Sequence, residues 1–129
     1  MIEKAVKYPI ILEERVGYDN EKKLLFLRFK ILKELVYFKG HFENLPILPG
    51  IAQLEFALFY AEKYKLIKKT NIESIDNLKF TQIIKPGYIV DLKIEKPSNK
   101  KLLFNYFNHD NHNSYSSGKI SLKLESLCE

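Results

Sequence analysis

Residues 40–61 read GHFENLPILPGIAQLEFALFYA, a loop that runs directly into an apolar segment. The loop is rigid, because Pro46 and Pro49 each fix φ and remove a backbone donor. Pro49 also suits the first turn of a helix, where the N–H that proline lacks is not used. From Gly50 to about Lys68 the chain holds no proline and no further glycine. This stretch therefore predicts one long helix that starts at a proline-bounded loop.

The expected helix is apolar on almost every side. Its apolar residues recur at helical spacing and then broaden into a band: Ile51, Leu54, Phe56, Ala57, Leu58, Phe59 and Ala61. A helix of this kind is enclosed by other elements rather than lying on the surface. The last turns are rich in lysine, which suits the negative end of the helix dipole, so we expect the far end to reach solvent.

Strand-like segments stand on both sides of the helix. They cover residues 8–16, 24–32, 75–84, 88–95, 101–107 and 115–124, with a shorter apolar run at 35–38. Turn residues separate them at 17–20, 86–87 and 97–99. One helix and five to seven strands predict an α+β fold, in which the sheet curls round the helix. An exposed sheet edge would then favour pairing with a second copy.

The bulk composition indicates one folded domain over residues 1–129. The apolar fraction is 46% and the net charge is +5, nearly all of it from lysines scattered among acids. This scatter is typical of a solvated surface rather than a nucleic-acid reader, although it would also attract an acidic protein or a phosphate-bearing ligand. The amino terminus carries no apolar leader and no segment is long enough to span a membrane. With the single cysteine at Cys128, we expect a cytoplasmic protein.

Three residues of the opening stretch bear on chemistry. Glu55 has apolar sequence neighbours, which predicts a desolvated carboxyl with a raised pKa that can give up a proton. A second interpretation puts Glu55 in an exposed polar stripe with Gln53 and Glu62. His41 is the natural residue to move a proton at neutral pH. Gly50, at a helix start, could offer an N–H to a developing negative charge, or could simply begin the helix.

The same residues carry a family resemblance. Gly-His-Phe, two spaced prolines, Pro-Gly and an acid five residues later stand at Gly40-His41-Phe42, Pro46, Pro49-Gly50 and Glu55. This pattern resembles the signature of the β-hydroxyacyl-acyl carrier protein dehydratases of fatty-acid synthesis. Lys79-Phe80 followed by Pro86-Gly87 is similar to the second landmark of that family. The resemblance spans about residues 35–92 and implies the hotdog fold, a long helix wrapped by an antiparallel sheet.

The resemblance also implies a division of labour. His41 would remove the α-proton of a 3-hydroxyacyl thioester, Glu55 would assist departure of the hydroxyl, and the Gly50 N–H would hold the thioester carbonyl. The substrate would contact four further residues: Phe42, Leu48, Pro49 and Phe80. In the family the histidine of one subunit meets the acid of the other, so we expect a homodimer, or a higher oligomer built from it. The expected partner is an acyl carrier protein whose phosphopantetheine carries the acyl chain, with no metal or redox cofactor.

The chain departs from the family pattern at three places. Glu43-Asn44 replaces the usual Pro-Gly, Phe59 stands where glutamine is common, and Tyr88 follows Pro86-Gly87 where aspartate is common. These departures predict a divergent branch with a differently shaped acyl tunnel, such as the dehydratase-like enzymes of aryl-polyene biosynthesis.

Two alternatives to the dehydratase remain open at this point: a hotdog thioesterase, and a non-catalytic acyl-binding subunit. The polar stretch His109–His112 contains ligand-type residues, but it is typical of a hairpin loop, and two histidines fall short of a tetrahedral zinc site.

Overall fold

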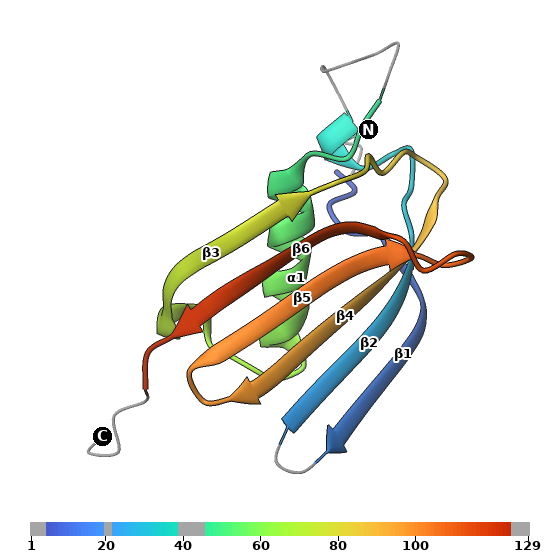
Figure 1. Ribbon diagram of the computed structural model, residues 1–129. Helices are drawn as coiled ribbons and strands as arrows, with labels where there is room; N and C mark the ends of the chain where they lie inside the picture. The colour runs from blue at the N-terminus through green and yellow to red at the C-terminus, as the bar shows by residue number, and fades with distance from the viewer. Residues whose placement is uncertain (1–4, 20–21, 39–45, 125–129) are drawn as a thin grey trace.

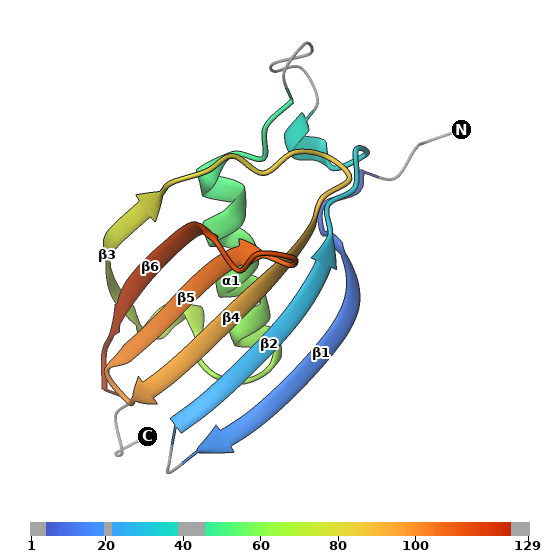
Figure 2. The same ribbon diagram turned by 45° about the vertical axis from the view of Figure 1, so that its right-hand side comes forward.

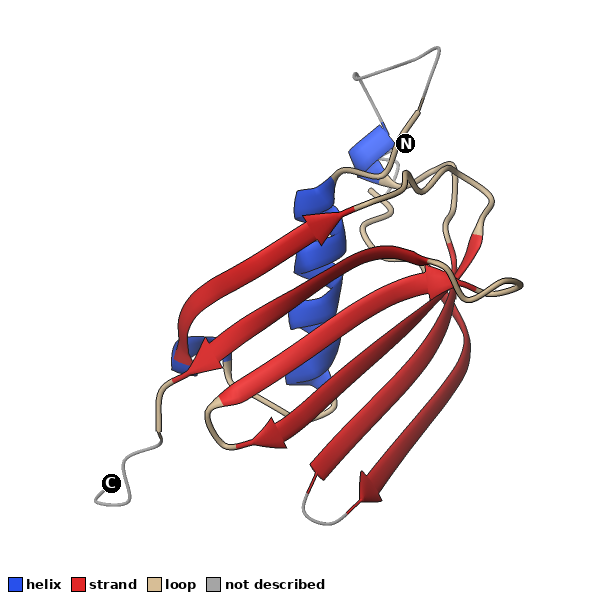
Figure 3. Cartoon of the chain, viewed as in Figure 1, coloured by secondary structure: helices blue, strands red, loops and turns tan. Residues whose placement is uncertain are grey.

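The computed structural model of the protein describes residues 5–19, 22–38 and 46–124. It contains one α-helix, α1 (Gly50–Lys63), and two short 3-10 helices, η1 (Val36–Phe38) and η2 (Lys69–Asn71). The strands are β1 (Ile10–Asp19), β2 (Lys22–Lys30), β3 (Ile72–Phe80), β4 (Ile89–Ser98), β5 (Lys101–Asn108) and β6 (Ser114–Leu122). The single long helix and the strand-rich remainder confirm the predicted α+β class (Figure 3).

The strands form one antiparallel sheet in the order β1-β2-β4-β5-β6-β3. Figures 1 and 2 show α1 lying along the concave face of this sheet, with β6 and β3 curving round it. The predicted wrapping of the sheet round the helix is therefore confirmed. In the described chain, β1 and β3 are the two edge strands of the sheet.

Alternation along the strands separates a core face from an outer face. In β2, Leu25, Leu27 and Phe29 are fully buried, whereas Phe26 and Arg28 between them are only partly covered. The same period of two places core residues of the neighbouring strands opposite α1. On the helix, the residues that meet them are Ala52, Leu54, Phe56, Ala57, Tyr60 and Ala61, all buried. The predicted enclosure of the helix is confirmed on this side only, because Ile51 of the apolar band is 66% exposed.

The helix ends earlier than predicted, at Lys63 instead of about Lys68. Lys65 has φ 64°, in the left-handed region. Its N–H donates to the carbonyl of Glu62, and the N–H of Leu66 donates to the carbonyl of Ala61. These two bonds form a Schellman motif, which stops a helix and satisfies its last carbonyls. Glycine usually takes the left-handed position, so a lysine there gave no signal in the sequence.

The short apolar run at 35–38 does not form a strand. Leu35 makes a single bridge with Val6, and residues 36–38 then turn into η1, where the Phe38 N–H donates to the Leu35 carbonyl at 3.0 Å. A strand needs a continuous partner, and the described chain offers only this one bridge at that place. Strand ends also differ from the predictions: β1 continues through Gly17 and Tyr18, and β4 continues through Pro97 to Ser98.

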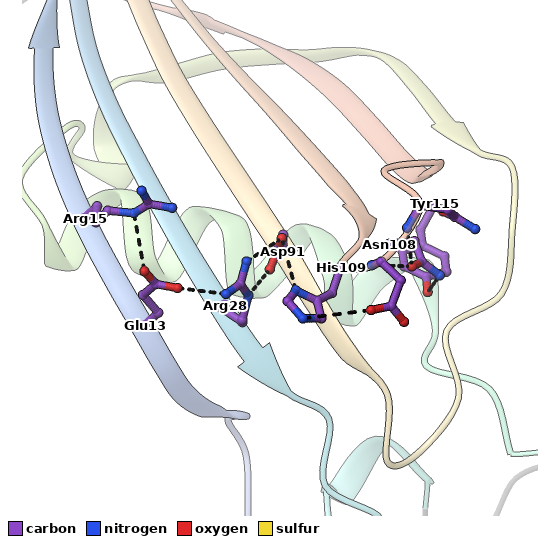
Figure 4. Close-up of polar contacts among 9 residues, drawn as sticks. Glu13, Arg15, Arg28, Asp91, Asn108, His109 and Tyr115 are labelled. Atoms are coloured by element: carbon purple, nitrogen blue, oxygen red, sulfur yellow. Dashed lines mark hydrogen bonds and ion pairs between the residues drawn. The ribbon is translucent and has the colours of Figure 1, made fainter.

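A chain of polar side chains on the outer face of the sheet ties three strands together (Figure 4). Arg28 of β2 donates from Nε to Asp91 Oδ1 in β4 and from Nη1 to Glu13 Oε2 in β1, both at 2.8 Å. His109 lies beside them, with its Nδ1 3.9 Å from Asp91 Oδ2. Asp91 is buried, and a buried carboxylate needs such a partner. The network therefore has a structural role, which is to satisfy Asp91 and to link the three strands.

The stretch His109–His112 joins β5 to β6, which confirms the predicted hairpin loop. Within the described ranges, no three or more His, Cys, Asp or Glu side chains gather where they could hold a metal ion. No helix in those ranges has the length and apolar character needed to cross a membrane.

Gly118 of β6 provides a test of the packing between β6 and its neighbouring strands, β5 and β3. A Cβ at this position would lie 2.4 Å from the Phe104 ring and 2.7 Å from Leu78 Cδ2, so Gly118→Ala must displace a buried ring. We expect a loss of about 1–3 kcal/mol in the free energy of unfolding, measured by urea denaturation. Gly17→Ala is the matched control, because its nearest contact is 4.0 Å and it should change stability by less than about 1 kcal/mol. Equal effects of the two substitutions would contradict this packing.

Candidate active site

The N-terminus of α1 presents open backbone donors. Its N-cap residue is Pro49, with φ −61° and ψ 149°, and no side chain caps the first turn. The Pro49 carbonyl accepts from the N–H groups of Ala52 and Gln53, at 3.1 and 3.2 Å. The first N–H groups of any helix have no partner inside that helix, and they carry the positive end of its dipole. This end of α1 therefore suits a group that develops negative charge.

Gly50 lies directly beneath the ring of Phe80. A Cβ at position 50 would be 2.8 Å from two carbons of that ring, so the close approach of Phe80 requires a glycine. This contact joins Pro49-Gly50 on the helix to Lys79-Phe80 at the end of β3, two landmarks that the sequence separates by about thirty residues. Phe80 remains half-exposed, so its ring also forms part of the surface beside the helix start.

A buried polar network holds the helix start from below. The side chain of Gln53 is 3% exposed; its Nε2 donates to the Leu48 carbonyl at 3.2 Å. Ser116 of β6 donates from Oγ to Gln53 Oε1 at 2.6 Å, and Tyr106 of β5 donates to the backbone carbonyl of Gln53 at 2.8 Å. The Leu48 N–H in turn donates to the carbonyl of Ile84 at 2.8 Å. The loop before α1 is thus fixed to the sheet.

Glu55 is exposed in this chain, so its predicted desolvation was wrong. Its sequence neighbours Leu54 and Phe56 are buried, but they point to other faces of the helix. Glu55 shares its own face with Ile51, one turn earlier, which is 66% exposed. The polar stripe of the second interpretation is also wrong in part, because Gln53 is buried while Glu55 and Glu62 are exposed.

Tyr37 of η1 is the hydrogen-bond partner of Glu55 among the described residues. Its hydroxyl donates to Glu55 Oε2 at 2.5 Å. Burial raises the pKa of Tyr37 to about 12, and the hydrogen bond to Glu55 adds to the rise. The phenol therefore keeps its proton at neutral pH and acts as a donor. The sequence analysis missed this residue, since an apolar run gives no sign that its tyrosine will reach an acid eighteen residues away.

The other predicted site residues have mixed positions. His41 and Phe42 lie outside the described residues. Leu48 is 1% exposed and packs in the core, which does not leave it open to a ligand in this chain, whereas Pro49 is half-buried. The structure brings Gly50, Phe80 and Glu55 to the same end of the molecule, on the helix start and the adjoining end of β3.

Two clefts of the described chain lie elsewhere. One, of about 760 Å³, lies between the β3–β4 connection and the β5–β6 loop, with Lys85, Tyr88 and His109 in its lining. The other, of about 790 Å³, lies at the C-terminal end of α1. Neither is lined by Gly50, Glu55 or Phe80. The carboxyl of Glu55 is thus on an open face, which a further surface would have to cover to make a closed site.

Comparison with known proteins identifies the class. A crystal structure of an uncharacterized protein from Erwinia carotovora subsp. atroseptica is 32% identical, with a TM-score of 0.77 over 91% of this chain and 97% of that one. The dehydratase heterocomplex ApeI:P from Xenorhabdus doucetiae is 29% identical, with a TM-score of 0.73 over 90% and 98%. A putative thioesterase from Lactococcus lactis, 14% identical with a TM-score of 0.60, shares the fold alone. The chain has the hotdog fold.

The family follows from the sequence matches. The model of the ApeI-like family, described as ApeI dehydratase, matches residues 18–119. The 3-hydroxyacyl-[acyl-carrier-protein] dehydratase FabZ of Nitrosospira multiformis is 32% identical over 98 residues, which cover 67% of this chain and 66% of that protein. The chain belongs to the ApeI-like dehydratase family, and the resemblance drawn from its motifs is confirmed. It spans about two thirds of the length of the FabZ protein it matches.

The buried network beneath the helix start can be tested by Gln53→Met. This substitution keeps the volume but leaves the Leu48 carbonyl and the Ser116 hydroxyl without their partner. We expect a loss of about 1–3 kcal/mol in the free energy of unfolding, measured by urea denaturation. Gln82→Met, at an exposed position, should leave stability within about 0.5 kcal/mol and serves as the control. A stable Gln53→Met protein would mean that the network does not hold the loop.

Proposed function

We propose that the protein dehydrates 3-hydroxyacyl thioesters, carried by an acyl carrier protein, to trans-2-enoyl thioesters, in fatty-acid or specialised lipid biosynthesis. The observation that carries the proposal is the placement of the Glu55 carboxyl one helical turn beyond the uncapped helix start at Gly50. An exposed carboxyl and the open N–H groups of the helix start thus lie at the same end of α1. Membership of the ApeI-like dehydratase family supports this chemistry.

The reaction assigns one role to each group. His41 takes the α-proton from C2 of the substrate, and the electron pair of that bond forms the C2–C3 double bond. The C3–O bond breaks, and Glu55 gives its proton to the departing hydroxyl, which leaves as water. The negative charge that gathers on the thioester oxygen is held by the N–H of Gly50 at the positive end of the helix dipole. Phe42, Pro49 and Phe80 are proposed to contact the substrate.

A second copy of the chain would complete the site. Glu55 lies on an open face, and the edge strand β3 beside it carries the exposed apolar side chains of Ile75, Leu78 and Phe80. An edge of this kind can pair with a strand of another chain. We propose a homodimer in which His41 of one copy faces Glu55 of the other. The ApeI:P dehydratase of Xenorhabdus doucetiae is a heterocomplex, so a related subunit is an alternative partner.

The acyl carrier protein is proposed as the substrate donor on the ground of charge. The chain has a net charge of +5, and lysines make up almost all of its basic residues. Acidic carriers would be drawn to such a surface, and the attraction should weaken as salt screens it.

The proposed activity is tested by incubating the protein with 3-hydroxyacyl-acyl carrier protein and following the intact carrier by mass spectrometry. We expect loss of one water to give the enoyl form, and the reverse reaction from trans-2-enoyl-acyl carrier protein. Glu55→Gln and His41→Ala should each lower kcat/KM by about 100- to 10,000-fold, as expected for loss of a general acid or base. Glu62→Gln, on the same helix but three turns from its start, should retain activity.

Other products would point to other functions. Release of free acid would identify a thioesterase, and binding of the acyl carrier without turnover would identify a non-catalytic acyl-binding subunit. Activity that survives both Glu55→Gln and His41→Ala would contradict the proposed roles.

The proposed dimer is tested by placing a charge on the β3 edge. Ile75→Lys puts an ammonium group where two β3 strands would pair, and we expect it to convert a dimer into a monomer and to abolish dehydration. Light scattering after size-exclusion chromatography gives the mass, to be compared with 15.2 kDa for one chain. Ile10→Lys makes the same change on the opposite edge strand, β1, at a side chain of similar exposure, and should leave the dimer intact. Monomeric wild-type protein with full activity would rule out the shared site.

A further inference from the structure

We infer that Tyr37 is a positioning residue for the acid of the reaction, and that its hydroxyl holds one oxygen of the Glu55 carboxyl and leaves the other oxygen for the substrate. The inference rests on the proposed dehydratase function. It concerns a contact between η1 and α1 within one chain, and so adds a member to the site that the family motif does not contain.

The donor is held in place from several sides. The Tyr37 ring packs edge-on against Phe56, with centroids 5.7 Å apart and an interplanar angle of 81°. On either side of it, the Val36 N–H donates to the Val6 carbonyl at 2.8 Å, and the Phe38 N–H donates to the Leu35 carbonyl at 3.0 Å. Because backbone and ring are both anchored, the hydroxyl reaches Glu55 from a fixed direction.

The hydroxyl can occupy one carboxyl oxygen only. It donates to Oε2 at 2.5 Å, and Glu55 is its hydrogen-bond acceptor in the part of the chain that the structure describes. With Oε2 engaged in this bond, Oε1 is the oxygen left to face the substrate.

The same bond serves the carboxyl after the proton has left. Transfer of the Glu55 proton to the departing hydroxyl makes water and leaves Glu55 as a carboxylate. A hydrogen bond from a neutral hydroxyl to an ionised oxygen is short, about 2.5–2.7 Å, and roughly twice as strong as one between neutral groups. Tyr37 thus continues to hold Oε2 once the carboxylate has formed, while its own proton stays in place.

If Tyr37 had a purely structural role, it would only tether η1 to α1. A double-mutant cycle distinguishes this role from the positioning of the Glu55 carboxyl. Tyr37→Phe keeps the ring against Phe56 and removes only the hydroxyl. In the otherwise wild-type protein we expect kcat to fall about 10- to 100-fold, the size of a hydrogen bond to a charged group, with KM little changed. In the Glu55→Gln background the same substitution should cost less than about twofold, because the acid through which it acts is gone.

The chain offers a matched control in a second tyrosine–glutamate pair. Tyr64, just after the far end of α1, donates to Oε2 of Glu14 in β1. Tyr64→Phe removes an equivalent exposed hydrogen bond and should leave kcat unchanged. Thermal unfolding of each variant reports any general loss of structure.

A second measurement follows the contact directly. In protein labelled with 13C at tyrosine Cζ, Glu55→Gln should move the Tyr37 resonance and leave the Tyr64 resonance in place. If the chemical shift of Tyr37 did not change, the inference would be overturned even if a variant proved unstable in the kinetic experiments.

The outcomes separate this inference from the proposed function. Active wild-type protein with an unaffected Tyr37→Phe variant, or an equal loss in both backgrounds of the cycle, would overturn the role of Tyr37 and leave the dehydratase standing. Wild-type protein that releases no water from any 3-hydroxyacyl carrier would overturn both.

Discussion

The burial of α1 against the concave face of the sheet is the interaction on which the other features depend. A helix of fourteen residues is only marginally stable alone in water, so its stability comes from the apolar side chains it packs into the sheet. The one buried polar side chain on it, Gln53, is satisfied by Leu48 and Ser116. This contact fixes the rotation of the helix about its axis, and with it the direction of every other residue.

The rotation of α1 explains why the proposed acid is on the surface. With Phe56, Ala57 and Tyr60 turned to the sheet, the face of Ile51 and Glu55 is left uncovered. Acid–base chemistry on a thioester is favoured where water is excluded, since electrostatic effects are stronger there. A covering surface from a second chain along β3 would supply that environment, and Tyr37 would already hold the carboxyl in place. The uncovered face of α1 is therefore consistent with one half of a site that a second chain completes.

Periodicity in the sequence was enough to predict the helix, most of the strands and their wrapping, because apolar spacing directly reflects burial. It failed where local geometry was unusual. The Schellman motif that ends α1 uses Lys65 in the left-handed position, where a glycine would have been the usual sequence signal. The apolar run at 35–38 makes one bridge only and has no partner strand in the described chain. The predicted desolvation of Glu55 failed for another reason: residues adjacent in a helix point about 100° apart, so Leu54 and Phe56 say little about the carboxyl between them.

The sequence by itself determined the order of the elements, the rigid loop before Gly50 and the motif that marks the dehydratase family, since each depends on residue types at fixed spacing. Only the tertiary structure decided that Phe80 lies over Gly50, that Gln53 is buried, and that Tyr37 reaches an exposed Glu55. These contacts join residues from different elements. They arise when a curved sheet fixes one rotation of the helix, and no local pattern along the chain encodes that rotation.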